Sequence, residues 1–156
     1  MNSGLVQSIA DLSSRWRSRF WRSKESSKTP EQIRGRFGEK TACRFLRKRG
    51  YKVLYRNFKD RGRTGGEIDI ICRDHDTLVF VEVKTRTNED LRRPFEDIKA
   101  FQKRQISRGA LAWLRLLDNP EIPFRFDVVE VIADGQAKPR CELIQNAFEL
   151  SKPYMY

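Results

Sequence analysis

The chain of 156 residues carries a formal net charge of +11, with 32 Lys and Arg against 21 Asp and Glu. This length suits one domain with a core of ordinary size. The basic excess favours a polyanionic partner, nucleic acid above all, over a basic protein without such a partner. No apolar run is long enough to span a bilayer, and the N-terminus lacks a continuous apolar signal segment. Three widely spaced cysteines exclude a CxxC or zinc pattern and favour reduced, buried thiols. We therefore expect a cytoplasmic protein.

Residues 1–30 differ in pattern from the rest of the chain. Apolar side chains recur at helical spacing between residues 5 and 20, and arginines surround them. Residues 5–22 are thus suited to a weak contact with an anionic membrane or a partner, and the alternative is a disordered extension. Residues 23–30, SKESSKTP, read as a linker. We therefore place the main domain at residues 31–150 and a short tail at 151–156.

The main domain is predicted to begin with a helix that starts near Pro30 and ends at Gly50, a typical C-terminal capping residue. One stripe of this helix is expected to be buried, and it comprises Ile33, Phe37, Ala42, Phe45 and Leu46. The next segment, YKVLYRNF (51–58), predicts a strand. RGRTGG (61–66) then predicts a mobile basic loop.

Two further strands follow as a hairpin, EIDIICR (67–73) and TLVFVEVKT (77–85), with His75 as a solvated turn residue between them. After a polar loop over 86–95, residues 96–117 show a helical pattern with one apolar and one basic side. FRFDVVEVI (124–132) predicts another strand, and CELIQNAF (141–148) a last one. This order predicts an α/β fold in which a mixed sheet is flanked by helices.

Charged residues interrupt both strands of the hairpin. Because side chains alternate across a strand, Asp69 should share a face with Glu67 and Ile71, and Glu82 should share a face with Lys84. The opposite faces should be purely apolar, formed by Ile68, Ile70 and Cys72 on one strand and Val79, Val81 and Val83 on the other. The hairpin should bring Asp69 near Glu82 at the end away from His75.

Two carboxylates in an apolar setting repel each other, and a divalent cation is one way to hold them together. Mg²⁺, or Mn²⁺ in its place, prefers hard oxygen ligands and keeps several waters, so two carboxylates and a carbonyl suffice. Lys84 would lie beside that ion, where an ammonium can orient water or offset negative charge. Asp69, Glu82 and Lys84 therefore predict a metal-dependent phosphodiesterase. The alternative is a structural Glu82–Lys84 ion pair on a solvated strand face.

Three segments carry a specific resemblance to a known family: GEKTACRFLRKRGYKVLYRNF, GGEIDIICRD and LVFVEVKTR. They resemble the YraN-like family of small bacterial proteins over about residues 31–150. That family is similar to archaeal Holliday-junction resolvases and to the restriction-endonuclease-like, PD-(D/E)xK nuclease fold. The resemblance implies an α-β-β-β-α-β core, with Asp69 and Glu82 as metal ligands and Lys84 as the catalytic lysine.

The same resemblance extends to residues outside the hairpin's centre. It implies that Glu39, on the first helix, supports the metal as part of the catalytic site. Glu67 matches a family glutamate to which we assign no role, and a solvated strand-start residue is the alternative. Arg56 and Asn57 match an RN pair of structural character. Gln102 stands where the family often has a lysine, and this departure bears on substrate contacts or rate.

The function predicted from these residues is that of a Mg²⁺-dependent endonuclease acting on DNA, with branched DNA as one candidate substrate. The alternatives are a nucleic-acid-binding protein that cuts poorly and an adaptor that uses the nuclease-like fold as a scaffold. Resolvases cut as dimers, so a homodimer is a further expectation. The residues expected to contact phosphates are Arg61, Arg63, Arg86, Lys99, Gln102, Lys103, Arg104 and Arg108.

Overall fold

The computed structural model describes residues 29–62, 65–86, 98–133 and 138–152. The predicted amphipathic segment and nearly all of the linker lie outside these residues, as does most of the predicted loop after the hairpin. Within the described ranges, no helix is long and apolar enough to cross a membrane.

The described elements confirm the predicted order of one helix, three strands, a second helix and two strands. In chain order they are α2 (Pro30–Lys48), β1 (Lys52–Lys59), β2 (Glu67–Asp74), β3 (Thr77–Arg86), α3 (Ala100–Leu116), β4 (Phe124–Ile132) and β5 (Arg140–Phe148).

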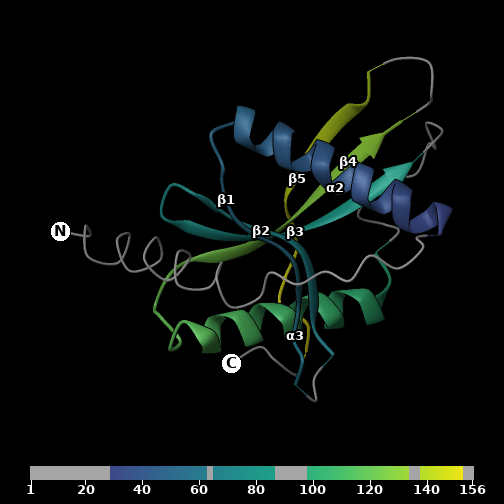
Figure 1. Ribbon diagram of the computed structural model, residues 1–156. Coiled ribbons are helices and arrows are strands. Elements are labelled where there is room, and N and C mark those ends of the chain that lie inside the picture. Colours follow the sequence, from purple (N-terminus) through teal and green to yellow (C-terminus); the bar gives the residue numbers. More distant parts are fainter. Residues whose placement is uncertain (1–28, 63–64, 87–97, 134–137, 153–156) are drawn as a thin grey trace.

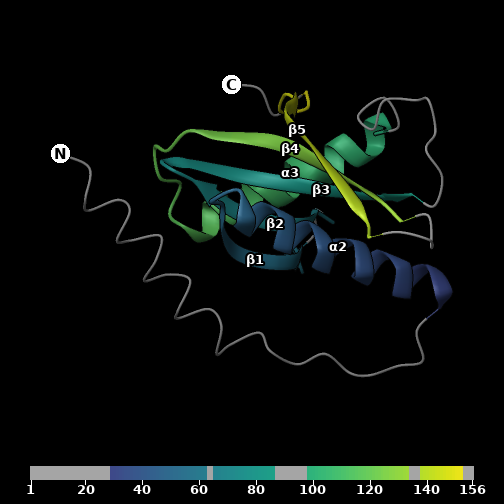
Figure 2. The ribbon, with the colours of Figure 1, turned by 90° about the horizontal axis from the view of Figure 1, so that it is seen from above.

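The five strands form one mixed sheet in the order β1-β2-β3-β4-β5. β3 and β4 pair in parallel, and the other three pairs are antiparallel. α3 supplies the crossover between the parallel strands, and α2 and α3 cover opposite faces of the sheet (Figure 1, Figure 2). The prediction of an α/β fold with a mixed sheet between helices is therefore confirmed.

Local sequence signals account for the ends of α2. The Thr29 side chain accepts a hydrogen bond from the Gln32 backbone, and the Gln32 side chain accepts one from the Thr29 N–H, which forms a capping box. Pro30 occupies the first helical turn, where its missing N–H costs nothing. After the helix, Gly50 has φ +89°, a left-handed conformation that glycine adopts without strain.

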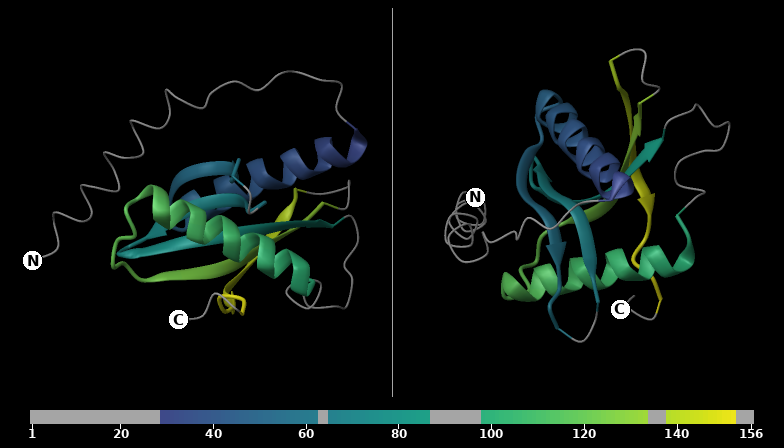
Figure 3. Two further views of the ribbon diagram at one scale, coloured as in Figure 1. Left: turned by 90° about the horizontal axis from the view of Figure 1, so that it is seen from below. Right: turned by 45° about the vertical axis from the view of Figure 1, so that its right-hand side comes forward.

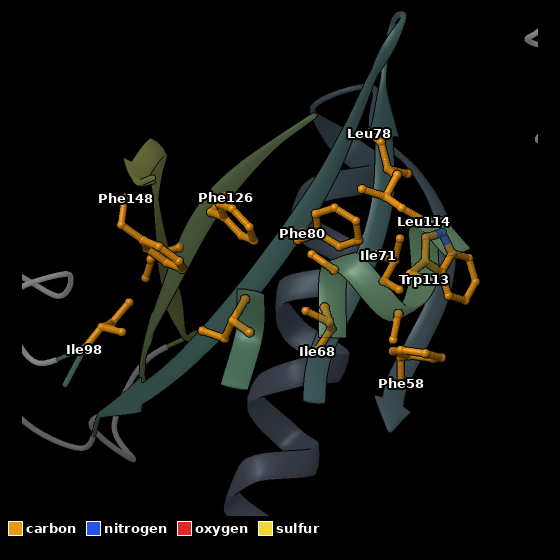
Figure 4. Packing of buried hydrophobic residues seen from close by; sticks show 14 residues of the cluster. Phe58, Ile68, Ile71, Leu78, Phe80, Ile98, Trp113, Leu114, Phe126 and Phe148 are labelled. Carbon is orange, nitrogen blue, oxygen red and sulfur yellow. The ribbon is translucent and has the colours of Figure 1, made fainter. Parts of the chain in front are cut away.

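Each helix packs its own hydrophobic cluster against the sheet. On the α2 side, Ala42, Cys43 and Leu46 are fully buried against apolar residues of β2, β3 and β4. On the α3 side, the larger cluster contains Phe58, Ile68, Ile71, Leu78, Phe80, Phe126, Phe148 and residues of α3 such as Trp113 (Figure 4). Cys43 and Cys72 are buried free thiols, as expected.

The predicted buried stripe of α2 is correct only for its C-terminal half. Ile33 and Phe37 are 56% and 46% exposed, whereas Ala42 and Leu46 have no exposed surface. The N-terminal turns of α2 reach beyond the ends of the strands (Figure 2), so this part of the stripe has no sheet to pack against.

The predicted apolar face of β2 is wrong at one residue. Ile70 and Cys72 pack on the α2 side, but Ile68 packs on the α3 side together with Ile71. Strict alternation would place Ile68 and Ile71, three residues apart, on opposite faces. β2 therefore changes face between them, at or beside Asp69.

A polar network ties four strands together at the turn end of the hairpin. The Arg125 guanidinium, on β4, donates to Asp127, to Asp74 at the end of β2 and to the Tyr51 hydroxyl before β1, with donor–acceptor distances near 2.9 Å. The fully buried Asp127 also accepts a hydrogen bond from the Asn146 N–H of β5. His75, in the adjacent turn, is exposed as expected, and its Nδ1 lies 2.9 Å from Oδ1 of Asp74.

Candidate active site

The candidate site lies where β2 and β3 part. Their ladder runs from Asp74–Thr77 at the turn to Ile70–Val81 and ends there. β2 continues alongside β1, whereas β3 continues alongside β4 to its end. The two strands therefore diverge, as Figure 3 shows. We call this divergence the fork and define it by Asp69 on β2 and by Glu82 and Val83 on β3.

Asp69 reaches across the fork. Its Oδ2 accepts a hydrogen bond of 2.8 Å from the Val83 N–H, so a side chain takes the place of the missing ladder contact. Burial raises the pKa of Asp69 well above its usual range, and the nearby Glu82 carboxylate raises this pKa further. The hydrogen bond from Val83 opposes both effects. The effect of Glu82 on the pKa of Asp69 thus supports the predicted approach of the two carboxylates.

Glu82 and Lys84 form an ion pair, with 3.2 Å between Lys84 Nζ and Glu82 Oε1. Their side chains are only 14% and 20% exposed, respectively. The ion pair considered as the alternative to catalysis is therefore present, but it does not lie on a solvated face. An ammonium and a carboxylate held together and largely shielded from water interact more strongly than an exposed pair.

Glu39 approaches the fork from α2. One of its carboxylate oxygens accepts a hydrogen bond from the Asn57 side chain, and its Oε2 is buried without a hydrogen-bond partner among the described residues. Burial raises the pKa of Glu39, and the bond from Asn57 and the charge of Arg56 oppose the rise. Glu39 in turn raises the pKa of Asp69, which places the two carboxylates within electrostatic reach of each other.

Glu67 belongs to the edge of this acidic group. It forms a salt bridge of 2.9 Å with Lys59 across the β1–β2 pair, and its side chain is 46% exposed. Its carboxylate raises the pKa of Asp69 less than Glu82 and Glu39 do. The reading of Glu67 as a solvated strand-start residue fits this position.

The oxygen groups at the fork suit a hard divalent cation. Within the described ranges, no three Asp, Glu, His or Cys side chains gather closely enough to form a complete cage for a metal. Mg²⁺ does not require one, because it usually binds one or two carboxylates and completes its octahedron with waters and phosphate oxygens. A cation in this place would relieve the repulsion between Asp69 and Glu82 and would give Oε2 of Glu39 a partner.

Several of the predicted phosphate-contacting residues have other partners in this structure. Arg86 forms a salt bridge with Glu130 of β4. The Gln102 side-chain oxygen accepts a hydrogen bond from the Lys99 N–H at 3.3 Å and so caps the start of α3. The Lys103 ammonium lies 5.7 Å from the centre of the Phe148 ring. These contacts hold the three side chains in defined places.

The remaining predicted basic residues differ in exposure. Arg61 and Arg104 are exposed, Arg108 is partly buried, and Arg63 lies outside the described residues. Arg104 and Arg108 share one stripe of α3, while Lys103 points some 100° away from Arg104. Helix geometry thus places Arg104 and Arg108 on one stripe of α3 and Lys103 on another.

The base of the predicted mobile loop is fixed. The Asp60 N–H donates to the Gly66 carbonyl at 2.8 Å, and Gly66 lies directly against Gly109 of α3. A Cβ on Gly66 would lie 2.3 Å from the Gly109 nitrogen, so only glycine fits here. α3 therefore supports the residues that lead into β2 and towards Asp69.

Sequence reasoning gave Asn57 only a structural role. The signal that could have singled it out is its place inside a strand pattern, since asparagine is depleted in strands but tolerates left-handed backbone. It has φ +54°.

Comparison with known proteins places the chain in a family. The model of "Uncharacterised protein family UPF0102" matches residues 38–131, a range that includes Glu39, Asp69, Glu82 and Lys84. The chain is 46% identical over 117 residues to a UPF0102 protein of Geobacter metallireducens, covering 75% of this chain and 93% of that protein. It is 44% identical over 114 residues to one of Symbiobacterium thermophilum, covering 73% and 94%. The chain therefore belongs to the UPF0102, or YraN-like, family, whose fold is restriction-endonuclease-like.

Proposed function

We propose that this protein is a metal-dependent endonuclease that hydrolyses phosphodiester bonds in DNA. The observation that carries the proposal is the fork: a partly buried Asp69 whose pKa is raised by burial and by the Glu82 carboxylate, and Lys84 3.2 Å from Glu82. A structural role alone gives no reason to place mutually repelling carboxylates where two strands separate. A catalytic site gives such a reason, because residues with perturbed pKa values are concentrated at sites that bind or stabilise charged groups during a reaction.

In this proposal Asp69 and Glu82 would hold a Mg²⁺ or Mn²⁺ ion, with Glu39 supporting it. Such an ion supplies a Lewis acid and lowers the pKa of a bound water. The chain's own contribution is to orient the groups around it. The Val83 N–H holds the Asp69 carboxylate, and Glu82 holds the Lys84 ammonium. Lys84 would then stabilise negative charge on the phosphoryl oxygens in the transition state.

Nucleic acid is favoured as the substrate by the overall charge of +11 and by the exposed Arg61 and Arg104. We further propose branched DNA as one candidate substrate, on the strength of the resemblance to Holliday-junction resolvases. Cleavage of both strands of such a substrate would need two sites, and a homodimer would supply them.

A cleavage panel tests the proposed function. Branched, nicked, duplex and single-stranded DNA, and RNA, are incubated with the protein in Mg²⁺, in Mn²⁺ and in EDTA. We expect metal-dependent cleavage of at least one DNA substrate, and a loss of about 10²-fold or more in Glu82→Gln. Glu142→Gln on β5, an exposed glutamate of the same sheet, is the matched control and should retain activity. Equal cleavage by wild type and Glu82→Gln would contradict the proposal.

A nucleic-acid-binding protein that cuts poorly is the second candidate. It is favoured by Lys84 already having a carboxylate partner and by the lack of a three-carboxylate cage among the described residues. In that case the protein would bind DNA in a separate binding assay, and the panel would show either no cleavage or cleavage that Glu82→Gln does not reduce.

A further inference from the structure

Beyond the register shift between Val53 and Tyr55, the β1–β2 ladder changes face on both strands at one further position. Tyr55 and Phe58 both pack on the α3 side, although residues three apart in an extended strand lie on opposite faces. Ile68 and Ile71 on β2 show the same exception.

The register of the two strands locates this change. Arg56 pairs with Ile70 and Phe58 pairs with Ile68, so Asn57 and Asp69 lie opposite each other between these pairs. The two strands thus change face together at Asn57 and Asp69.

Asn57 has the backbone conformation that such a change needs. Its φ of +54° lies in the left-handed region, which non-glycine residues enter at a cost and asparagine enters most readily. No other described residue of β1 or β2 has a positive φ. The change of face allows Phe58 and Ile68 to pack in the same cluster as Trp113 of α3. The Phe58 and Trp113 rings pack edge to face, with 5.2 Å between the ring centres.

The turn at Asn57 coincides with the opening of the fork. Asp69, opposite Asn57, is the first residue of β2 beyond the ladder with β3, and its carboxylate bonds to the Val83 N–H. The Asn57 side chain donates a hydrogen bond to Glu39 on α2. Asn57 therefore lies opposite the Asp69 carboxylate of β2 and contacts the Glu39 carboxylate of α2.

We propose that Asn57 is the positioning residue of the fork. Its left-handed backbone turns the β1–β2 ladder so that Asp69 enters the fork, and its side-chain amide holds one oxygen of Glu39 while Oε2 stays without a partner. The use of this arrangement for catalysis rests on the proposed function, but the arrangement itself does not. A role in packing alone would require the left-handed backbone and would give the amide nothing to do.

Two substitutions separate the backbone from the side chain. Asn57→Gly keeps the left-handed conformation at no steric cost and removes the amide, whereas Asn57→Ala removes the amide and disfavours the conformation. The readout for the backbone is hydrogen exchange of the Val83 amide, which Asp69 protects, measured against the Val129 amide to correct for global unfolding. Asp69→Ala gives the fully unprotected reference.

We expect the Val83 amide to exchange about tenfold faster in Asn57→Ala than in the wild type, and at nearly the wild-type rate in Asn57→Gly. Asn146→Ala is the matched control, because Asn146 has φ +50° on β5 at the opposite end of the sheet. It should leave Val83 unchanged relative to Val129. Wild-type exchange of Val83 in Asn57→Ala, or an equal change in the glycine and alanine variants, would overturn the backbone role.

A double-mutant cycle tests the side chain. Because Asn57 and Glu39 share a hydrogen bond, the effects of Asn57→Gly and Glu39→Ala on the midpoint of urea unfolding should not add. Additive effects would overturn the role of the amide. Neither measurement uses a metal or a nucleic acid, so both decide the role of Asn57 even if every cleavage assay fails.

Discussion

Asp69 is the residue whose ionisation most affects the stability of the fork. Its raised pKa means that the folded protein binds a proton here more readily than the unfolded chain does. The ionised Asp69 therefore lowers the free energy of unfolding. This effect is at its full size above the pKa of Asp69 in the folded protein, and it disappears as the pH falls towards 3.8, the ordinary pKa of the group. The metal-free protein should therefore gain stability when the pH is lowered moderately from neutrality.

The substitution Asp69→Asn should flatten this pH dependence, since it removes the carboxylate that repels Glu82. It should also stabilise the metal-free protein at pH 7 by about 1–2 kcal/mol and abolish the rise in Tm that Mg²⁺ or Mn²⁺ causes in the wild type. Thermal unfolding between pH 5 and pH 7, with and without the cation, measures all three effects. Asp76→Asn in the exposed turn is the control. An equal metal-induced shift in Asp69→Asn and wild type would show that the cation binds elsewhere.

Asp74 has the opposite pH behaviour. Its hydrogen bond with Arg125 lowers its pKa below 3.8, so its contribution to stability is present above that pH and is lost as the pH falls through the folded pKa. Asp74→Asn should cost about 1 kcal/mol at pH 7, the scale of a partly exposed charged hydrogen bond. Urea unfolding of both proteins from pH 7 to pH 3 should show the difference shrinking at the acid end. A constant difference would exclude Arg125 as the cause.

Among the elements, α3 shapes the entrance to β2 through a contact between glycines. Gly109 is in mid-helix, where alanine would ordinarily be the better residue. A Cβ there would lie 2.8 Å from Cγ1 of Ile68, and Gly66 already lies against this turn of α3. The close approach of helix and strand therefore requires glycine at both positions.

Gly109→Ala should destabilise the protein by about 1–3 kcal/mol in spite of the gain in helix propensity. Gly35→Ala on α2 is the matched control, because a Cβ on Gly35 meets nothing within 4 Å. It should stabilise the protein by about 0.5–1 kcal/mol. Urea unfolding measures both. Stabilisation by Gly109→Ala would mean that α3 does not pack this closely against β2.

Local sequence patterns were sufficient for most elements and for part of the site. The alternation and the short turn predicted the hairpin and the approach of Asp69 to Glu82, since both follow from contacts between neighbouring strands. The position of Ile68 could not be predicted in this way, because it depends on packing against α3 and on the conformation of Asn57. The exposure of Ile33 and Phe37 depends on where the sheet ends, which no helical pattern specifies.

For the whole molecule, the net charge of +11 predicts nucleic-acid binding that weakens steeply with salt. If Arg104 contacts a phosphate, Arg104→Ala should reduce the slope of log affinity against log salt by about 1. Lys48→Ala, at the exposed C-terminal end of α2, should leave the slope unchanged. Fluorescence anisotropy with labelled DNA between 50 and 200 mM salt, about the range over which phosphate contacts show most clearly, measures the slope. A flat salt dependence in the wild type would count against phosphate contacts altogether.

The proposed function depends most on Lys84, because the effect of removing this residue distinguishes an enzyme from a binding protein. Lys84 is not expected to ligate the metal. Lys84→Met keeps the apolar stem and removes the charge, so it should lower stability through the lost ion pair with Glu82, but below its Tm it should leave DNA affinity nearly intact. An interaction made mainly in the transition state contributes to rate more than to binding. The decisive measurement compares single-turnover cleavage in Mg²⁺ at saturating protein with DNA affinity in Ca²⁺. We predict a loss of about 10²-fold or more in the cleavage rate with little change in affinity. Equal losses in rate and affinity would contradict a catalytic role for Lys84 and with it the proposed function.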